Sequence, residues 1–461
     1  MADLEPLQSY VDLAVEHAQS SNVEAIAYGQ LASGSQVRFS QNSIDINKRW
    51  ETQKLTLFLV VDKTKTGVTE ISVTSEEDVK SAVEDTIAFT NLLPDAMFYH
   101  GVEEKIHKYS PIRDLYDDRI EIFAEKAPGI VNSAIDAAIS EGAKRVAGAL
   151  KFNREFGIMK SSFGPSGESK RTLYDLNIRA FQDQLDYSGH GISCGTLPSR
   201  SEKDMIEAGA AAGRFSRQAK GARQGDPGTY DLILSPTVSS DLIGYTPSVA
   251  DPFSIMMGLS PLGDKMGEQL APEFITASDD PTLPGGMASR AFDFEGTPSR
   301  KTPIVENGVL KGLVHNTSTA QMYETESTGS SALADLGRGL RMLLPAPSNI
   351  VFENGDHSFE ELVEGSRPAI YMTVNWYTRW QNYQTGEFST ITRDATFLVK
   401  DGEFEPIKNL RVSDNILRMF ANITAMGNDR KQVYWWGSEN LIPTHIPSVR
   451  IADCRMTAAT Q

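Results

Sequence analysis

This sequence of 461 residues lacks the features that mark membrane and secreted proteins. Its longest apolar run, residues 57–61, is far shorter than the roughly 20 residues that cross a bilayer. Residues 1–5 contain neither the basic nor the apolar segment of a signal peptide. Its two cysteines, Cys194 and Cys454, have no second Cys or His at zinc-site spacing, which favours free thiols in a reducing compartment. We therefore expect a soluble cytoplasmic protein without membrane contact.

Positive charge is also scarce. The sequence has 44 Lys and Arg against 61 Asp and Glu, a net charge of −17. Such a chain repels a phosphate backbone, so we expect no nucleic-acid partner. The glycine-rich patterns that cradle phosphates or dinucleotides are missing as well.

Histidine pairs are absent too. A metallopeptidase helix of the form His-Glu-x-x-x-His places two His ligands on one face and a Glu beside the metal-bound water. No two His here lie within six residues of each other, which excludes such a helix but leaves open a site assembled from distant ligands. The seven are His17, His100, His107, His190, His315, His357 and His445.

One pattern typical of a nucleophile is present, Gly-x-Ser-x-Gly at residues 191–195. A nucleophile elbow needs an apolar strand before it and a helix after it. Polar residues 186–189 precede the pattern and Thr196-Leu197-Pro198 follows it, so the required context is missing. Cys194, with His190 four residues earlier, is a second candidate, but we favour a structural role for Ser193 and Cys194.

Periodicity divides the chain into a helix-and-strand half and a half with short strands between Gly and Pro turns. In the first half it predicts helices at 7–20, after an N-cap at Ser75, at 115–142 with a break at Pro128, and at 202–220, with strands at 55–61, 146–150 and 173–180. Turn residues at 224–228 suggest two domains, residues 1–224 and 225–461. The short runs of the second half favour an antiparallel sheet.

The richest motif is residues 292–300 (FDFEGTPSR). Asp293 and Glu295 lie two apart, so on a strand their side chains would share one face, where they could bind a cation or a basic peptide group. The alternative is a solvated edge that pairs with Arg290 or Arg300. Further motifs follow in order: Glu306-Asn307-Gly308, residues 316–320 (NTSTA), Ser327-Thr328-Gly329 and Pro347-Ser348-Asn349.

The order and spacing of these motifs resemble the TldD/TldE family, also called PmbA or modulator of DNA gyrase. Its metal-binding members carry His-Glu-x-x-x-His at a place that matches residues 243–249, and this sequence has IGYTPSV there. The family's third ligand, a Cys before Gly, matches Met426-Gly427 here. Residues 385–389 and 426–429 are similar to motifs of the TldE/PmbA branch, so the resemblance implies a member without a metal site.

The resemblance implies an α+β protein, with an N-terminal α/β domain followed by a C-terminal domain built on a large curved antiparallel sheet. It also implies a non-catalytic subunit that assembles with a TldD-like His-Glu-x-x-x-His peptidase, around a chamber for unfolded peptides. We expect zinc only in that partner, and no cofactor in this chain. Candidate chamber residues are Tyr245, Asp293, Glu295, Arg300, Asn316 and Met426.

Two alternatives remain from the sequence. One is a homodimer that binds peptides without cutting them, which co-purification with a metal-carrying partner would distinguish. The other is modulation of DNA gyrase through protein contact, which we rank last because no residue points to a topoisomerase surface. Whether the chain has any enzymatic activity of its own stays open.

Overall fold

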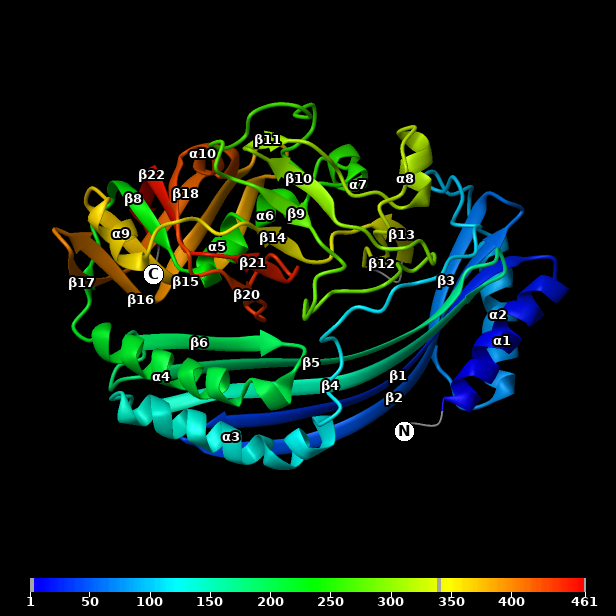
Figure 1. The fold of residues 1–461 in the computed structure, drawn as a ribbon, viewed down its shortest axis with the longest axis horizontal. Coiled ribbons are helices and arrows are strands. Elements are labelled where there is room, and N and C mark those ends of the chain that lie inside the picture. Colours follow the sequence, from blue (N-terminus) through cyan, green and yellow to red (C-terminus); the bar gives the residue numbers. More distant parts are fainter. Residues whose placement is uncertain (1–3, 338–340, 460–461) are drawn as a thin grey trace.

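The N-terminal half is a six-stranded antiparallel sheet flanked by four α-helices (Figure 1). The structure, a computed structural model, describes residues 4–337 and 341–459. The elements of this half are α1 (Glu5–Ser20), β1 (Glu24–Ser40), β2 (Ser43–Val61), β3 (Lys65–Ser72), α2 (Glu76–Asn91), α3 (Ile120–Ser140), β4 (Arg145–Ser161), β5 (Ser166–Phe181), β6 (Ser188–Gly195), a 3-10 turn (Pro198–Arg200) and α4 (Glu202–Gln218). The strand order is β3-β2-β1-β4-β5-β6. Strands β1 to β3 and strands β4 to β6 each form a three-stranded meander, which lies between two helices in the sequence. The pairing of β1 with β4 joins the two meanders. The unit αβββα therefore occurs twice.

Local sequence explains the long strands. β1 and β2 meet at a two-residue turn, Gln41-Asn42, where both residues have positive φ (49° and 65°). A two-residue turn with positive φ at both positions matches the twist of the flanking strands. The predicted N-cap at Ser75 is confirmed, because its hydroxyl accepts a hydrogen bond from Asp78 N.

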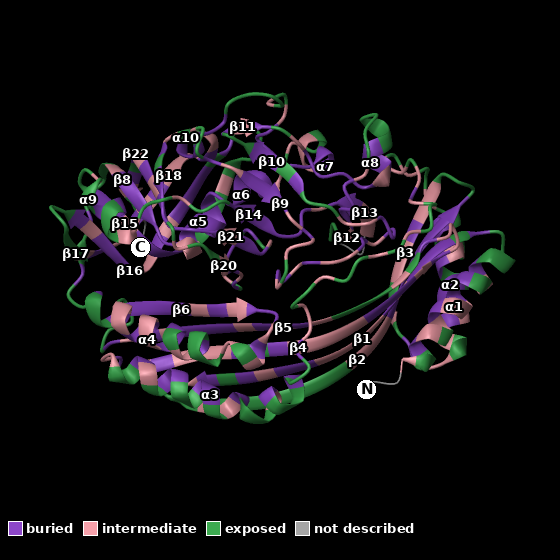
Figure 2. Ribbon diagram, viewed as in Figure 1, coloured by how far each residue is buried: buried purple, intermediate pink, exposed green. Residues whose placement is uncertain are grey.

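All four helices cover the same outer face of the sheet, in two pairs. α1 and α2 pack on one end, over Leu55, Leu57 and Leu59, and α3 and α4 pack on the other. Their outward sides are exposed (Figure 2). Gly209 of α4 lets the helix approach α3 closely, since a Cβ there would lie 2.1 Å from Ala134 O.

The predicted break at Pro128 was wrong. α3 starts at Ile120, five residues later than predicted, and runs through Pro128 to Ser140. A proline inside a helix removes one backbone hydrogen bond. The flanking residues Phe123, Ala127 and Val131 are buried in the core with α4, and this packing offsets the loss.

The C-terminal half contains an eight-stranded sheet, a six-stranded sheet and a two-stranded hairpin. Its elements are β7 (Arg223–Gln224), β8 (Gly228–Leu234), α5 (Pro236–Leu242), α6 (Tyr245–Ser248), α7 (Pro252–Met256), β9 (Ala277–Asp279), β10 (Thr302–Glu306), β11 (Val309–Leu310), α8 (Thr317–Met322), β12 (Ser331–Asp335), β13 (Arg341–Pro345), β14 (Ile350–Phe352), α9 (Phe359–Glu364), β15 (Ala369–Asn382), β16 (Glu387–Lys400), β17 (Glu403–Lys408), β18 (Leu410–Asn415), α10 (Ile416–Ala421), β19 (Ile423–Met426), β20 (Lys431–Val433), β21 (Thr444–Ile446) and β22 (Val449–Ala458). The predicted α+β architecture is confirmed. Most strand pairs are antiparallel, and β8–β15, β7–β17 and β14–β21 are parallel.

The inner face of the first sheet packs against the C-terminal half. Ile26, Phe58 and Met159 form one cluster with Phe292, and Leu343 of β13 packs against it. This contact places the loop around residue 292 beside the N-terminal sheet. The boundary at residue 225 stays a prediction. Among the described helices, none has the length and apolar character needed to span a bilayer.

Candidate functional site

Asp293 shapes a tight turn. Its side chain is 2% exposed. Oδ1 accepts hydrogen bonds from the backbone N–H groups of Glu295 and Thr297, both at 3.0 Å, and Oδ2 accepts one from Ser331 N at 2.8 Å. The carboxylate thus ties its own loop to the start of β12. Asp293 belongs to the turn as well as to the candidate site.

Glu295 follows two residues later and is fully buried. Among the described residues, neither carboxyl oxygen has a well-aligned hydrogen-bond partner, although the Thr317 and Ser331 side chains lie beside it. Burial, and then the negative charge of Asp293, raise the pKa of Glu295. Thr317 and Ser331 only partly oppose this rise. The pair therefore favours a protonated Glu295 beside a hydrogen-bonded Asp293.

Asn316 caps α8, whose first residue, Thr317, lies beside Glu295. Its Oδ1 accepts a hydrogen bond from Thr319 N at 2.9 Å and another from the Thr319 hydroxyl at 2.8 Å. Asn316 is 1% exposed. Its side chain is therefore committed to the start of the helix.

Arg300 opens onto a cavity of about 800 Å³, a size typical of small-ligand sites. Its guanidinium pairs with the exposed Glu326 at 3.3 Å. The apolar side chains of the lining are Ile255, Leu262, Met266, Pro303 and Leu313, and the polar and charged residues include Asp264, Lys301, Glu306, Lys311, His315, Tyr323, Thr325 and Thr328. The mixture of apolar and charged walls suits a peptide segment.

His315 and Tyr323 are residues of this cavity that the sequence analysis did not single out as site candidates. Their rings contact each other, with centroids 5.5 Å apart. Burial, with a contribution from the Arg300 cation, lowers the pKa of His315, so the ring is neutral near pH 7. The NTSTA motif could have drawn attention to this site, because His315 directly precedes Asn316, the N-cap of α8.

Tyr245 lies elsewhere, in α6, where metal-binding relatives were expected to carry their motif. Its ring stacks on Trp380 with centroids 4.0 Å apart, and its hydroxyl donates to Leu259 O at 3.4 Å. Burial raises the pKa of Tyr245. Pro247 lies inside this four-residue helix. The position is thus filled by a packed aromatic side chain.

Asp241 of α5 is the carboxylate nearest in sequence to that position, and it does not fit a metal. It is 2% exposed and accepts hydrogen bonds from five donors. These are Asn375 Nδ2 (2.5 Å), Thr378 Oγ1 (3.0 Å), Ser438 Oγ (2.7 Å), Glu439 N (2.7 Å) and Asn440 N (3.0 Å). Both oxygens are therefore occupied. Sequence reasoning missed Asp241, because its donors lie more than a hundred residues away and leave no local spacing.

The remaining histidines do not gather around a carboxylate cluster. Within residues 4–337 and 341–459, no three His, Cys, Asp or Glu side chains form a group that could hold a metal ion. Burial lowers the pKa of His190 and of His445 to about 4. Both rings are therefore neutral at pH 7 in separate parts of the fold.

Met426 ends β19 and is 3% exposed, in the core of the C-terminal half. It pairs with Val449 of β22. The structure thus brings Asp293, Glu295, Arg300 and Asn316 into one region and places Tyr245 and Met426 in others.

The Gly-x-Ser-x-Gly pattern lies within β6. Its glycines serve packing, since a Cβ at Gly191 would lie 1.9 Å from Ala208 O of α4. Burial raises the pKa of the Cys194 thiol to about 12, which leaves it protonated and unreactive. These observations agree with a structural role for Ser193 and Cys194.

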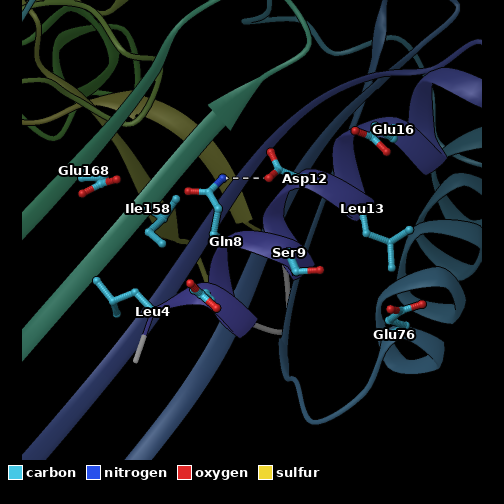
Figure 3. Close-up of a pocket in the computed structure, with 10 residues that line it drawn as sticks. Leu4, Gln8, Ser9, Asp12, Leu13, Glu16, Glu76, Ile158 and Glu168 are labelled. Carbon is cyan, nitrogen blue, oxygen red and sulfur yellow. Dashed lines mark hydrogen bonds between the residues drawn. The ribbon is translucent and has the colours of Figure 1, made fainter. Parts of the chain in front are cut away.

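Two further cavities lie apart from Arg300. One, of about 550 Å³, lies between the halves and is lined by Tyr28 and Arg171 on one side and Phe292 and Asp293 on the other. The second, of about 590 Å³, lies beside α1 and has Asp12, Glu16, Glu76 and Glu168 on its walls (Figure 3). In it, Gln8 donates to Asp12 at 3.0 Å, and Lys160 pairs with Asp12 at 2.6 Å. None of the predicted site residues lines this second cavity.

Comparison with known proteins gives both a family and a fold. The model of the PmbA/TldA metallopeptidase C-terminal domain matches residues 227–458, half of the chain. A metalloprotease of Methanothermobacter thermautotrophicus is 29% identical over 285 residues, which cover 58% of this chain. The chain thus spans only 60% of that relative's length.

Two solved structures share the fold over nearly the whole chain. A protein of Thermotoga maritima described as a modulator of a DNA gyrase has a TM-score of 0.82 at 22% identity, covering 98% of this chain and 100% of that one. TldE of Thermococcus kodakarensis also has a TM-score of 0.82, at 18% identity, covering 98% of this chain and 99% of that one. At these identities the likeness concerns the fold.

Proposed function

Because this chain belongs to the PmbA/TldD metallopeptidase family, we propose that it is the metal-free, TldE/PmbA-like subunit of a two-component peptidase that processes unfolded peptides. The partner is a TldD-like relative with the His-Glu-x-x-x-His helix. That partner holds the zinc, which polarises the scissile carbonyl and activates water. This chain contributes one wall of the peptide chamber.

The observation that carries the proposal is the packing at α5 and α6. Tyr245 is stacked on Trp380, and the carboxylate of Asp241 is occupied by five donors. A zinc site needs three protein ligands with free lone pairs around an open coordination position. The residues at this place do not supply them, while the family's fold is retained around them.

The cavity beside Arg300 supports a peptide-handling role. Lys301 and Lys311 line it together with Glu306 and Glu326, so it can contact main-chain and side-chain groups of either charge. Apolar side chains such as Leu313 and Met266 lie between them. Such a surface suits substrates that differ in sequence.

The test is cleavage of an unstructured peptide by this chain alone, by a His-Glu-x-x-x-His relative from the same organism alone, and by their mixture, each with and without chelator. We expect chelator-sensitive cleavage by the mixture that exceeds cleavage by the relative alone. A mixture with the relative's motif Glu changed to Gln is the matched control.

Cleavage by this chain alone would contradict the proposal and would reopen Ser193, Cys194 and the histidines. Peptide binding by this chain as a homodimer, with no gain in the mixture, would instead support the non-proteolytic alternative. Direct contact with DNA gyrase has no specific observation in its favour.

A further inference from the structure

A basic cavity of about 470 Å³ lies where the end of the first sheet meets the C-terminal sheet. Its walls come from β4, β5 and the start of β6 on one side and from β16, β17 and the residue after β17 on the other. The lining residues are Arg145, Arg179, Phe181, Leu185, Asp186, Ser188, Thr392, Arg393, Asp394, Thr396, Lys408 and Asn409. Four cations thus face two carboxylates, in a chain whose net charge is −17.

Strand register places two of the arginines around one ring. Arg145 of β4 lies opposite Phe181 of β5, and Arg179 lies two residues before Phe181 on the same face. The guanidinium carbons of Arg145 and Arg179 lie 4.7 and 5.0 Å from the ring centroid. Stacking on the ring fixes both cations at the wall of the cavity.

The two carboxylates neutralise only part of this charge. Asp394 has a 1% exposed side chain, and its Oδ1 accepts from Arg179 at 2.5 Å and from the Ser188 hydroxyl at 2.5 Å. Asp186 pairs with Lys408 at 2.8 Å. In the described parts of the chain, no carboxylate lies within 4.0 Å of a side-chain nitrogen of Arg145 or Arg393. Two guanidiniums of the cavity are therefore without an acidic partner.

Arg393 lies between a second cation and an aromatic ring. Burial, and then the charge of Arg179, lower its pKa, and the charge of Asp394 opposes this shift only in part. Its guanidinium lies over the Trp376 ring, 4.2 Å from the centroid. Trp376 contacts Trp436, a 58% exposed ring. An aromatic surface thus extends from the cavity towards solvent.

We propose that this cavity binds a carboxylate group of an extended peptide, through the guanidiniums of Arg393 and Arg145, while Trp376 and Trp436 contact the adjoining peptide side chains. A guanidinium donates two parallel hydrogen bonds to a carboxylate, and Arg179 and Asp394 already pair within the same cavity. The carboxylate is the peptide's C-terminus or an acidic side chain. This inference rests on the proposed peptide-handling function and assigns it a recognition group.

The test compares three fluorescent peptides of one unstructured sequence, by anisotropy, on the full chain. The first has a free C-terminal carboxylate, the second a C-terminal amide, and the third an amide with one internal Glu. We expect the free acid to bind about tenfold more tightly than the plain amide, because only the acid offers a charged acceptor to the guanidiniums. The third peptide distinguishes the two sources, because it regains the tight binding only if a side-chain carboxylate is accepted.

Two variants locate the effect. Arg393→Gln is expected to weaken the free acid to the level of the amide and to leave the amide unchanged. Arg145→Gln tests the same cavity from the other half of the fold, so misfolding of one variant does not remove the test. Arg367→Gln makes the same charge change at a 72% exposed side chain outside the cavity and is expected to have no effect.

Equal affinity for all three peptides would overturn this inference while peptide binding itself stands. Equal loss of acid and amide binding in Arg393→Gln would also overturn it. Failure of every peptide to bind would overturn it together with the peptide-binding part of the proposed function, which the cleavage assay of the mixture tests separately.

Discussion

The two halves of this protein bury different kinds of side chain. The N-terminal sheet buries apolar residues beneath its helices, with Leu55, Leu57 and Phe123 almost fully enclosed. Among the described residues, the N-terminal half buries one carboxylate, Asp117, whereas the C-terminal half encloses several, and two of them, Asp241 and Asp293, hold loops together. Apolar burial is non-directional, whereas a buried carboxylate fixes the donors around it. The half with the candidate site is therefore specified by polar contacts that are costly to disturb.

The strongest test of this contrast is Asp241→Ala. Five buried donors would lose their acceptor, so we expect the free energy of unfolding to fall by at least about 3 kcal/mol. Urea unfolding followed by circular dichroism measures it. Asp226→Ala is the control, because Asp226 is exposed and solvent screens its pair with Arg223, so we expect little change in the free energy of unfolding. Equal losses in the two variants would contradict the contrast.

The corresponding test of the N-terminal half changes a glycine. Gly209→Ala places a methyl group 2.1 Å from Ala134 O, so we expect α4 to move away from α3 at a cost of about 1–3 kcal/mol. Gly129→Ala in α3 meets no atom within 4 Å, and it should stabilise by about 0.5–1 kcal/mol. Thermal unfolding of both variants checks the opposite signs. A Gly209→Ala variant as stable as the parent, or more stable, would show that the helix pair is not closely packed.

The pH dependence of stability sharpens the comparison. The pKa of Glu295 is raised in the folded state above its ordinary value of 4.5. Above that pH the unfolded chain releases the proton while the folded chain keeps it, so stability falls as pH rises, by at most about 1.4 kcal/mol per unit. Glu295→Gln should flatten this decline in urea unfolding above pH 5. The control Glu403→Gln, at an exposed residue, should show the same decline of stability with pH as the parent. If Glu295→Gln also shows that decline unchanged, Glu295 is not its source.

The smallest effect is expected at the rim of the candidate cavity. Arg300 and Glu326 are 49% and 87% exposed, so solvent screens their attraction. Arg300→Gln should change the free energy of unfolding by less than about 1 kcal/mol. A larger loss of unfolding free energy in urea would show that Arg300 stabilises the loop. Arg300 would then be a structural residue and not part of the binding surface.

Sequence reasoning succeeded where one face of an element is buried. α1, the N-cap Ser75 and the apolar end of β2 have local patterns that follow directly from that burial. The first part of β2 was missed, because residues 43–54 are largely exposed and polar and leave no alternation. Asp293 and Glu295 were found through their motif. The cavity of Arg145 and Arg393 was missed, since these residues are 248 positions apart in sequence and meet only after the halves pack.

The doubled αβββα unit implies an order of folding. Within each meander, neighbouring strands are joined by short turns, as at Gln41-Asn42, so their contacts close small loops. The union of the two units pairs Ile26 with Ser161, across more than a hundred residues. Contacts of such separation form slowly, because the chain loses more entropy before they form. We expect the backbone amides within each meander to gain protection from hydrogen exchange before the amides that pair β1 with β4. Docking of the two units would then be the late, rate-limiting event.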